Sequence, residues 1–146
     1  QHKITVAKND YVPLFKLEYG LSEQIIYIVI YNASQYTPKG ASIEISIDYK
    51  PEVDFEFHTN KQMTCIFTIS DDGKGFPEAA IDKAFDKFYR VNDSKTGGTG
   101  LGLSIVKGFT EAQNGIVKLQ NKEEGGAIFK VAFPAAVMQL KDISNE

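Results

Sequence analysis

The sequence predicts a layered α+β sandwich in which helices cover one face of a sheet. Three segments in which apolar and polar residues alternate, 43–47, 53–57 and 65–69, predict strands with one buried face. Two stretches, 22–33 and 101–112, carry apolar residues at the three- and four-residue spacing of an amphipathic helix. Long helices interleaved with strands and hairpins favour two layers around one core.

The remaining segments complete this arrangement. Residues 4–7 predict a short strand, and residues 116–119 and 127–133 predict a closing hairpin. The first helix is expected to begin at Ser22, a good N-cap residue, and to end before Pro38. Helical character extends over 79–90. We therefore expect one domain over residues 1–136, followed by a polar tail over residues 137–146.

The bulk composition narrows the function classes. A chain of 146 residues with a net charge of −3 and scattered lysines gives no reason to expect nucleic acid as a partner. Cys65 is the single cysteine, which excludes an internal disulfide, fits a reducing compartment and favours a buried, inert thiol. No apolar run approaches the ~18 residues that cross a bilayer. The chain begins inside a strand-like segment, so we expect it to be a fragment of a longer protein. We expect this fragment to be cytoplasmic and monomeric.

The first motif lies on the predicted first helix. Asn32, Gln35 and Tyr36 share one stripe with Ile28, because residues three and four apart are neighbours on a helix. The amide oxygen of Asn32 is a hard, neutral ligand that suits Mg²⁺. The ring of Tyr36 could lie against a flat base. Alternatively, Asn32 is a surface polar residue near a helix end.

The second motif, residues 71–76, follows a predicted strand and reads Asp-Asp-Gly-Lys-Gly-Phe. An ionised Asp71 is an acceptor that can receive a hydrogen bond from an exocyclic amine such as that of adenine. Gly73 and Gly75 allow positive φ and close approach of the backbone to a ligand. The alternative is an ordinary acidic turn.

The third motif is the glycine-rich run 97–103, which opens the second helix. Backbone N–H groups at a helix start form an anion site. The run lacks the last glycine of a dinucleotide fingerprint and the Gly-Lys-Ser/Thr ending of a P-loop. A flexible hinge is the alternative. Together the three motifs predict a pocket for a nucleoside triphosphate with a hard metal ion.

The order and spacing of these motifs resemble the ATP-binding domain of two-component sensor histidine kinases. The wider superfamily also holds gyrase-type ATPases, Hsp90 and MutL. The resemblance covers about residues 20 to 133 and includes four sequence boxes, namely the N box at 32–38, the G1 box at 71–75, the F box at 85–90 and the G2 box at 98–106. It implies the Bergerat fold, a two-layer sandwich with a mixed, mostly antiparallel sheet of about five strands backed by three helices.

The resemblance also implies the ligands and their contacts. ATP and Mg²⁺ would be the cofactors, with Asn32 as the metal ligand and Arg90 as a candidate phosphate contact. A lid would run from about residue 86 to 98. The implied nucleotide-binding residues are Asn32, Gln35, Tyr36, Asp71, Gly73, Gly75, Phe76, Phe88, Arg90, Gly98, Thr99, Gly100, Leu101 and Gly102.

Two positions depart from the family pattern. Many members carry Asn where this chain has Ile28, and Lys where it has Gln35, so we expect weaker Mg²⁺–ATP affinity. Hydrolytic relatives carry a general-base Glu at the position of Ile28. An isoleucine cannot take a proton, which favours transfer of the γ-phosphoryl group to a separate acceptor over hydrolysis.

The resemblance implies a protein-histidine kinase domain whose acceptor histidine lies elsewhere. Neither His2 nor His58 sits on a helix beside an acidic residue, so both are expected to be structural. The expected partners are a phosphoacceptor and dimerisation domain of the same, homodimeric parent, and a response regulator. The alternatives are a catalytically weak nucleotide-binding module, an anti-sigma-factor-type serine kinase and an interaction domain.

Overall fold

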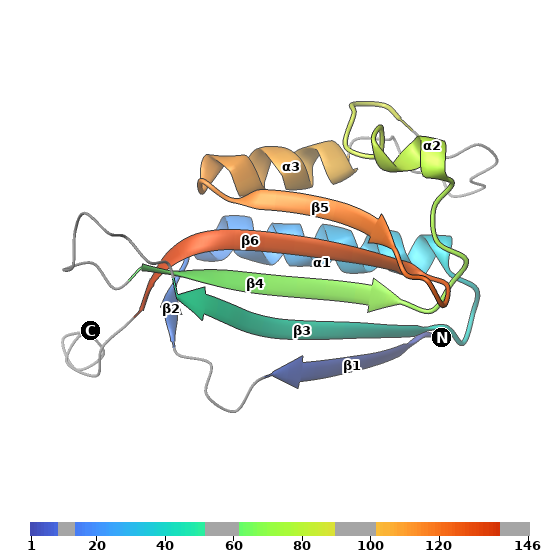
Figure 1. The fold of residues 1–146 in the computed structure, drawn as a ribbon, viewed down its shortest axis with the longest axis horizontal. Coiled ribbons are helices and arrows are strands. Elements are labelled where there is room, and N and C mark those ends of the chain that lie inside the picture. Colours follow the sequence, from blue (N-terminus) through green and yellow to red (C-terminus); the bar gives the residue numbers. More distant parts are fainter. Residues whose placement is uncertain (9–13, 52–61, 90–101, 138–146) are drawn as a thin grey trace.

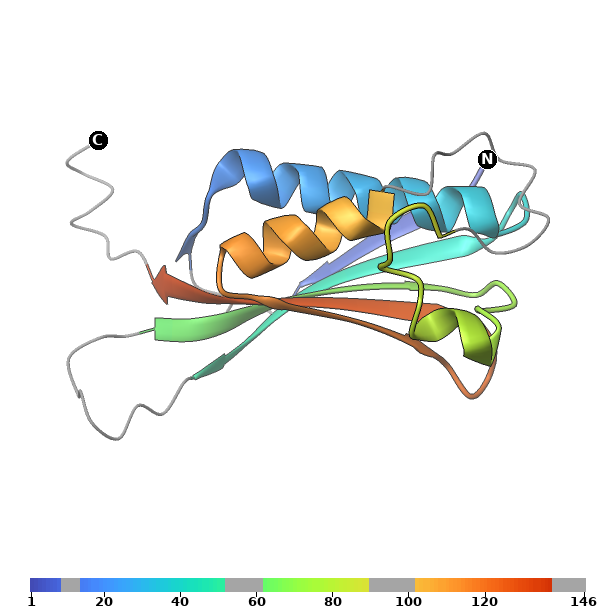
Figure 2. The same cartoon turned by 90° about the horizontal axis from the view of Figure 1, so that it is seen from above.

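A computed structural model describes residues 1–8, 14–51, 62–89 and 102–137. Figure 1 shows a six-stranded sheet, and Figure 2 shows two long helices packed on one of its faces. The sheet order is β1-β3-β4-β6-β2, with β5 paired to β6. The strands are β1 (Lys3–Lys8), β2 (Phe15–Lys16), β3 (Ser42–Pro51), β4 (Gln62–Asp71), β5 (Ile116–Asn121) and β6 (Ala127–Val137).

The sheet is mixed, as the sequence predicts. β1 runs parallel to β3, whereas β3, β4, β6 and β5 pair antiparallel. β2 pairs antiparallel with the last residues of β6, beyond the part of β6 that pairs with β5. The predicted strand over 53–57 lies outside the described residues. β6 includes Val137, so the expected polar tail starts within a strand, and its residues from 138 onward lie outside the described part of the chain.

The core lies between the sheet and the two long helices. Alternate residues of each central strand point toward the helices, and this is the pattern that the alternation of apolar residues predicts. Phe67 and Phe133 meet edge to face with ring centroids 6.2 Å apart. The least exposed core side chains come from both layers, namely Ile25, Val29, Ile43, Ile69, Val106, Phe129, Val131 and Phe133.

The predicted N-cap of helix α1 (Tyr19–Tyr36) is wrong. The helix begins before Ser22, and Glu18 occupies the N-cap position. Ser22 is buried on the same face as Ile25 and Val29, so packing against the sheet outweighs its capping preference. The C-terminus is as predicted, because Thr37 caps the helix through a backbone hydrogen bond to Ala33.

Helix α2 (Glu78–Ile81) is a single turn, so the prediction of helical structure over 79–90 was too long. Turns follow α2, and Phe88 adopts a φ of 65°, which no α-helix contains. Phe85 instead points its ring at Phe129 in the core, at a centroid distance of 6.5 Å. The residues after α2 therefore place an aromatic ring in the core without forming a helix.

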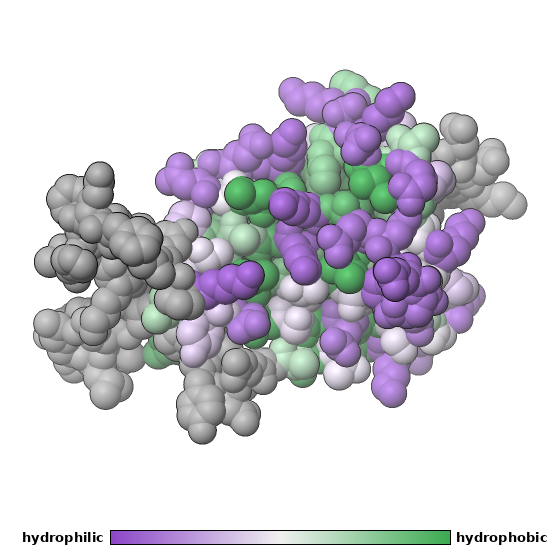
Figure 3. All heavy atoms as spheres, in the orientation of Figure 1, coloured by the Kyte–Doolittle hydropathy of each residue, from purple (hydrophilic) through white to green (hydrophobic). Residues whose placement is uncertain are grey.

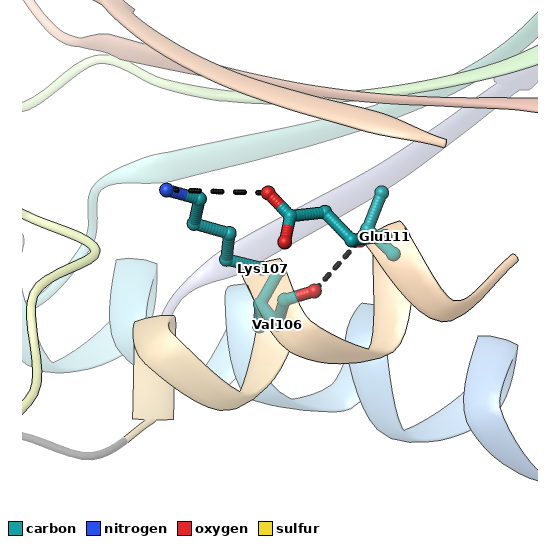
Figure 4. Close-up of polar contacts among 4 residues, drawn as sticks. Val106, Lys107 and Glu111 are labelled. Carbon is teal, nitrogen blue, oxygen red and sulfur yellow. Dashed lines mark hydrogen bonds and ion pairs between the residues drawn. The ribbon is translucent and has the colours of Figure 1, made fainter. Parts of the chain in front are cut away.

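Helix α3 (Gly102–Ala112) packs antiparallel beside α1 and matches the predicted helix. Figure 4 shows two of its polar contacts. The hydroxyl of Thr110, a fully buried residue, donates to the carbonyl of Val106 at 2.7 Å, which satisfies it inside the core. Lys107 and Glu111 form an exposed ion pair at 4.0 Å, which contributes little to stability. The apolar face of α3 therefore holds it in place.

The face of the sheet that the helices do not cover has a mixed surface. The open face of the sheet, seen in Figure 3, mixes polar side chains with scattered apolar ones. Within the described part of the chain, no helix is both long and apolar enough to cross a membrane.

Cys65 is buried on the face of the sheet that the helices cover, and burial raises the pKa of its thiol to about 11. The predicted burial of the thiol is confirmed, and its raised pKa disfavours the reactive thiolate.

Candidate functional site

The C-terminal half of α1 contacts both of the other predicted motifs. Tyr36 and Phe76 place their ring centroids 5.9 Å apart. At the start of α3, a methyl group added at Gly102 would lie 3.3 Å from Cγ2 of Ile28. The fold therefore brings the helix motif, the acidic turn and the described end of the glycine-rich run to one region.

Asp71 ends β4 and is buried, with 6% of its surface exposed. Its Oδ1 accepts hydrogen bonds from the backbone N–H groups of Gly73, at 2.9 Å, and Ala127, at 3.3 Å. Two donors from separate elements fix the orientation of the carboxylate. Because both bonds reach Oδ1, Oδ2 is the oxygen through which Asp71 can meet a ligand.

The turn between β5 and β6 packs against the backbone of Asp71. Gly126 has a φ of 98°, and a Cβ at this position would overlap the carbonyl oxygen of Asp71. Only glycine permits both this conformation and this approach. The sequence predicts a hairpin from residues 116–119 and 127–133 but gives no sign of this contact with Asp71, because the two segments lie far apart in the chain.

Asn121, at the end of β5, holds the second half of the acidic turn. Its Oδ1 accepts from the backbone N–H of Phe76 at 2.8 Å, and its Nδ2 donates to the carbonyl of Phe76 at 2.7 Å. Gly75, with a φ of 77°, makes room, since a Cβ there would lie 2.6 Å from Asn121 Oδ1. No sequence motif indicates this contact. The ring of Phe76 also meets Phe129 edge to face, which anchors the turn in the core.

Asn32 is half-buried on α1, and its Oδ1 is fully buried without a hydrogen-bond partner among the described residues. A buried acceptor without a partner is costly, so such an atom is a place to expect a ligand. A neutral carbonyl oxygen is a ligand that Mg²⁺ accepts alongside phosphate oxygens and water. No cluster of three His, Cys, Asp or Glu side chains stands within the described ranges, so a metal held there would take most of its ligands from elsewhere.

The other predicted site residues divide into three groups. Gln35 is exposed on α1, and Phe88, after α2, is 71% exposed. Gly102 begins α3 beside α1. The remaining ones, as well as most of the predicted lid, lie outside the described residues, namely Arg90, Gly98, Thr99, Gly100 and Leu101.

Sequence comparison places the domain among known proteins. A family described as histidine kinase-, DNA gyrase B- and HSP90-like ATPases matches residues 19–137. The chain belongs to this ATPase family. The sensor protein KdpD of Clostridium acetobutylicum is 36% identical over 137 residues, which are 91% of this chain and 14% of the relative. The sensor histidine kinase WalK of Bacillus subtilis is 32% identical over 122 residues, which are 82% of this chain and 18% of the relative.

The chain thus spans less than a fifth of the length of these two curated relatives. Solved structures agree on the fold. The mycobacterial sensor histidine kinase MprB superposes with a TM-score of 0.73 at 19% identity, covering 94% of this chain and 86% of that one. The catalytic domain of the histidine kinase ThkA gives a TM-score of 0.71 at 22% identity, covering 91% and 78%. The predicted sandwich of a mixed sheet and helices is confirmed, and the described residues form six strands and three helices, of which α2 has a single turn.

Proposed function

We propose that this chain is the ATP-binding catalytic domain of a sensor histidine kinase, which transfers the γ-phosphoryl group of ATP to a histidine on another domain of its parent. The observation that carries the proposal is the buried, unpartnered Oδ1 of Asn32, on the helix that both other motifs contact. Membership of the ATPase family and the sensor-kinase relatives support it.

Each described site residue has a role in this proposal. Oδ2 of Asp71 accepts a hydrogen bond from the adenine amine, because Oδ1 is held by the backbone. Tyr36 and Phe76, whose tilted rings contact each other with centroids 5.9 Å apart, lie against the base. Asn32 would hold Mg²⁺, which would neutralise charge on the phosphates. The N–H groups at the start of α3, around Gly102, face the phosphates.

Catalysis in this proposal consists of positioning and charge stabilisation. The bond between the γ-phosphorus and its bridging oxygen breaks as an imidazole nitrogen bonds to phosphorus, and ADP leaves. Ile28 offers no proton acceptor for a water molecule, which disfavours hydrolysis. Gly73 and Gly75 keep the acidic turn in its observed conformation, and Arg90, Phe88, Gln35 and residues 98–101 remain proposed contacts of the nucleotide.

The proposed partners follow from the relatives. They are a phosphoacceptor and dimerisation domain of the same parent, which forms a homodimer, and a response regulator. We propose that the domain itself is monomeric and lies in the cytoplasm. A catalytically weak nucleotide-binding module is the second candidate function, and the apolar Ile28 beside the start of α3 favours it.

The test is Mg²⁺-dependent binding of ATP to the wild-type chain and to Asn32→Ala, with Ser34→Ala as a matched control on the same helix. Ser34 donates a hydrogen bond to the carbonyl of Tyr31 within its own helix, so the control should bind as wild type does. We expect Asn32→Ala to weaken Mg²⁺–ATP binding about ten- to a hundredfold and to remove its magnesium dependence. Equal binding by wild type and Asn32→Ala contradicts the proposed role of Asn32.

Phosphoryl transfer separates the candidate functions. The chain is mixed with a separate polypeptide that carries an acceptor histidine and with labelled ATP. Acid-labile, alkali-stable label on that polypeptide supports the kinase. ATP binding without transfer supports the weak module, acid-stable label supports a serine kinase, and absence of any nucleotide effect on the melting temperature supports an interaction domain.

A second prediction concerns the two departures from the family pattern. Replacing Gln35 with lysine and Ile28 with asparagine is expected to raise Mg²⁺–ATP affinity roughly ten- to a hundredfold, because each change adds a polar contact at the phosphate end. Titration of nucleotide against the single and double variants measures this. Gln35 is exposed, so Gln35→Lys should leave the melting temperature unchanged, whereas Ile28 packs against the core. No gain in affinity from Gln35→Lys would count against its proposed position near the phosphates.

A further inference from the structure

The first three residues of the chain lie along the loop that follows α1. Gln1 accepts a hydrogen bond from the N–H of Gly40 at 2.9 Å, and Lys3 donates its N–H to Ala41 at 3.1 Å. Between them, the half-buried ring of His2 places Nε2 2.8 Å from Oγ1 of Thr37 and 3.4 Å from the Thr37 carbonyl oxygen. A side chain at the start of β1 therefore reaches the C-cap of the helix that carries Asn32 and Tyr36.

The partners of Thr37 determine the direction of this bond. The hydroxyl of Thr37 donates its one proton to the carbonyl of Ala33 at 2.8 Å. Its oxygen, like the Thr37 carbonyl, is then left to accept. Nε2 of His2 must therefore carry a proton and donate to both oxygens. Either the neutral tautomer protonated at Nε2 or the imidazolium satisfies this requirement.

Thr37 is buried, and its methyl group lies against the acidic turn. A Cβ added at Gly73 would come 2.9 Å from Cγ2 of Thr37 and 3.1 Å from Oδ1 of Asp71. The N–H of Gly73 is also one of the two donors that orient Asp71. A change in the side-chain torsion of Thr37 would thus move the turn that holds the carboxylate.

We propose that His2 is a positioning residue of the nucleotide site: it fixes the side chain of Thr37, and through Thr37 it fixes the turn that orients Asp71. The inference rests on the proposed function, in which Asp71 binds adenine. It links strand β1 to the base-binding end of the site, so β1 and the nucleotide stabilise each other's position. Thermodynamic linkage makes this coupling reciprocal. If the contact with β1 strengthens nucleotide binding, nucleotide binding must stabilise the start of β1 against opening by the same free energy.

Affinity for ATP, measured by calorimetry on the whole chain, tests this. We expect His2→Ala to weaken ATP binding about two- to tenfold, the equivalent of one neutral hydrogen bond. His2→Gln keeps an N–H donor at a comparable reach and should restore binding to within about twofold. Thr5→Ala is the matched control, because Thr5 is exposed on the same strand, and it should bind as wild type does.

Two further readouts distinguish positioning from a general effect on folding. Long-range ¹H–¹⁵N spectra should show a protonated Nε2 in His2, and its ring resonances should shift when ATP is added. Hydrogen exchange at the N–H groups of Lys3 and Gly40 should slow on ATP binding in wild type, and less so in His2→Ala.

The outcomes separate this inference from the proposed function. If the wild type binds ATP and His2→Ala binds it equally well, the inference is wrong and the proposed function stands. If His2→Gln is as weak as His2→Ala while both melt at a lower temperature than wild type, His2 is merely structural. A wild-type chain that binds no ATP overturns the proposed function, and the inference with it.

Discussion

Replacing Asp71 with asparagine is expected to weaken ATP binding by about a hundredfold or more. An amide oxygen at Oδ1 can still accept from Gly73 and Ala127, so the bonds that orient the side chain are kept. The amide NH₂ group then replaces Oδ2 and faces the amine of adenine, so that two donors meet. Loss of a charge-assisted hydrogen bond combined with an unpaired buried donor accounts for the size of the effect.

The base offers an internal control for this prediction. Inosine triphosphate carries a carbonyl where ATP carries the amine, so Asp71→Asn should lose less affinity for inosine triphosphate than for ATP. Calorimetric titration of both nucleotides against both proteins measures the difference. An equal loss of affinity for the two nucleotides, at an unchanged melting temperature, would show that Asp71 does not bind the amine of adenine.

Replacing Gly126 with alanine is expected to lower the free energy of unfolding by roughly 3–5 kcal/mol. The new Cβ would overlap the carbonyl oxygen of Asp71, and the φ of 98° is one that side chains rarely adopt. The β5–β6 turn must move away from the end of β4, and this removes the bond from Ala127 to Asp71. ATP binding is therefore expected to fall in parallel. Denaturant unfolding measures the change in stability.

Two other glycines separate the causes. Gly40 has a φ of 90° with nothing near its hypothetical Cβ, so Gly40→Ala should show the conformational cost alone, roughly 1–2 kcal/mol. Gly108 lies in α3 with open space around it, and Gly108→Ala should stabilise the fold by about 1 kcal/mol. If Gly126→Ala costs no more than Gly40→Ala, the contact with Asp71 carries none of the effect.

The sequence predicts the layers of this fold because its strands alternate cleanly. Cys65, Phe67 and Ile69 all face the helices, and the intervening residues face outward. The two errors in the predicted helices have a common cause. Ser22 is a good N-cap residue that packing buries, and Phe85 turns into the core where helical periodicity would continue. Local propensity is a weaker determinant than burial at both places.

The candidate site was predictable only in its local motifs. Asn32, Asp71 and Gly75 each stand out by residue type in a short segment, and the fold brings these segments together. Asn121 and Gly126 do not stand out, because their roles are contacts with the backbone of Phe76 and Asp71, far earlier in the chain. Without the strand register, nothing in the sequence indicates which polar residue meets which turn.

The position of β1 at the rim of the sheet carries a risk of self-association. Among the described strands it pairs with β3 alone, and its Ile4 and Val6 are 54% and 64% exposed. Such a strand can template a second chain, which leads to aggregation. Lys3 and Lys8 stand at its two ends, and mutual repulsion of such charges in stacked copies opposes the growth of an intermolecular sheet.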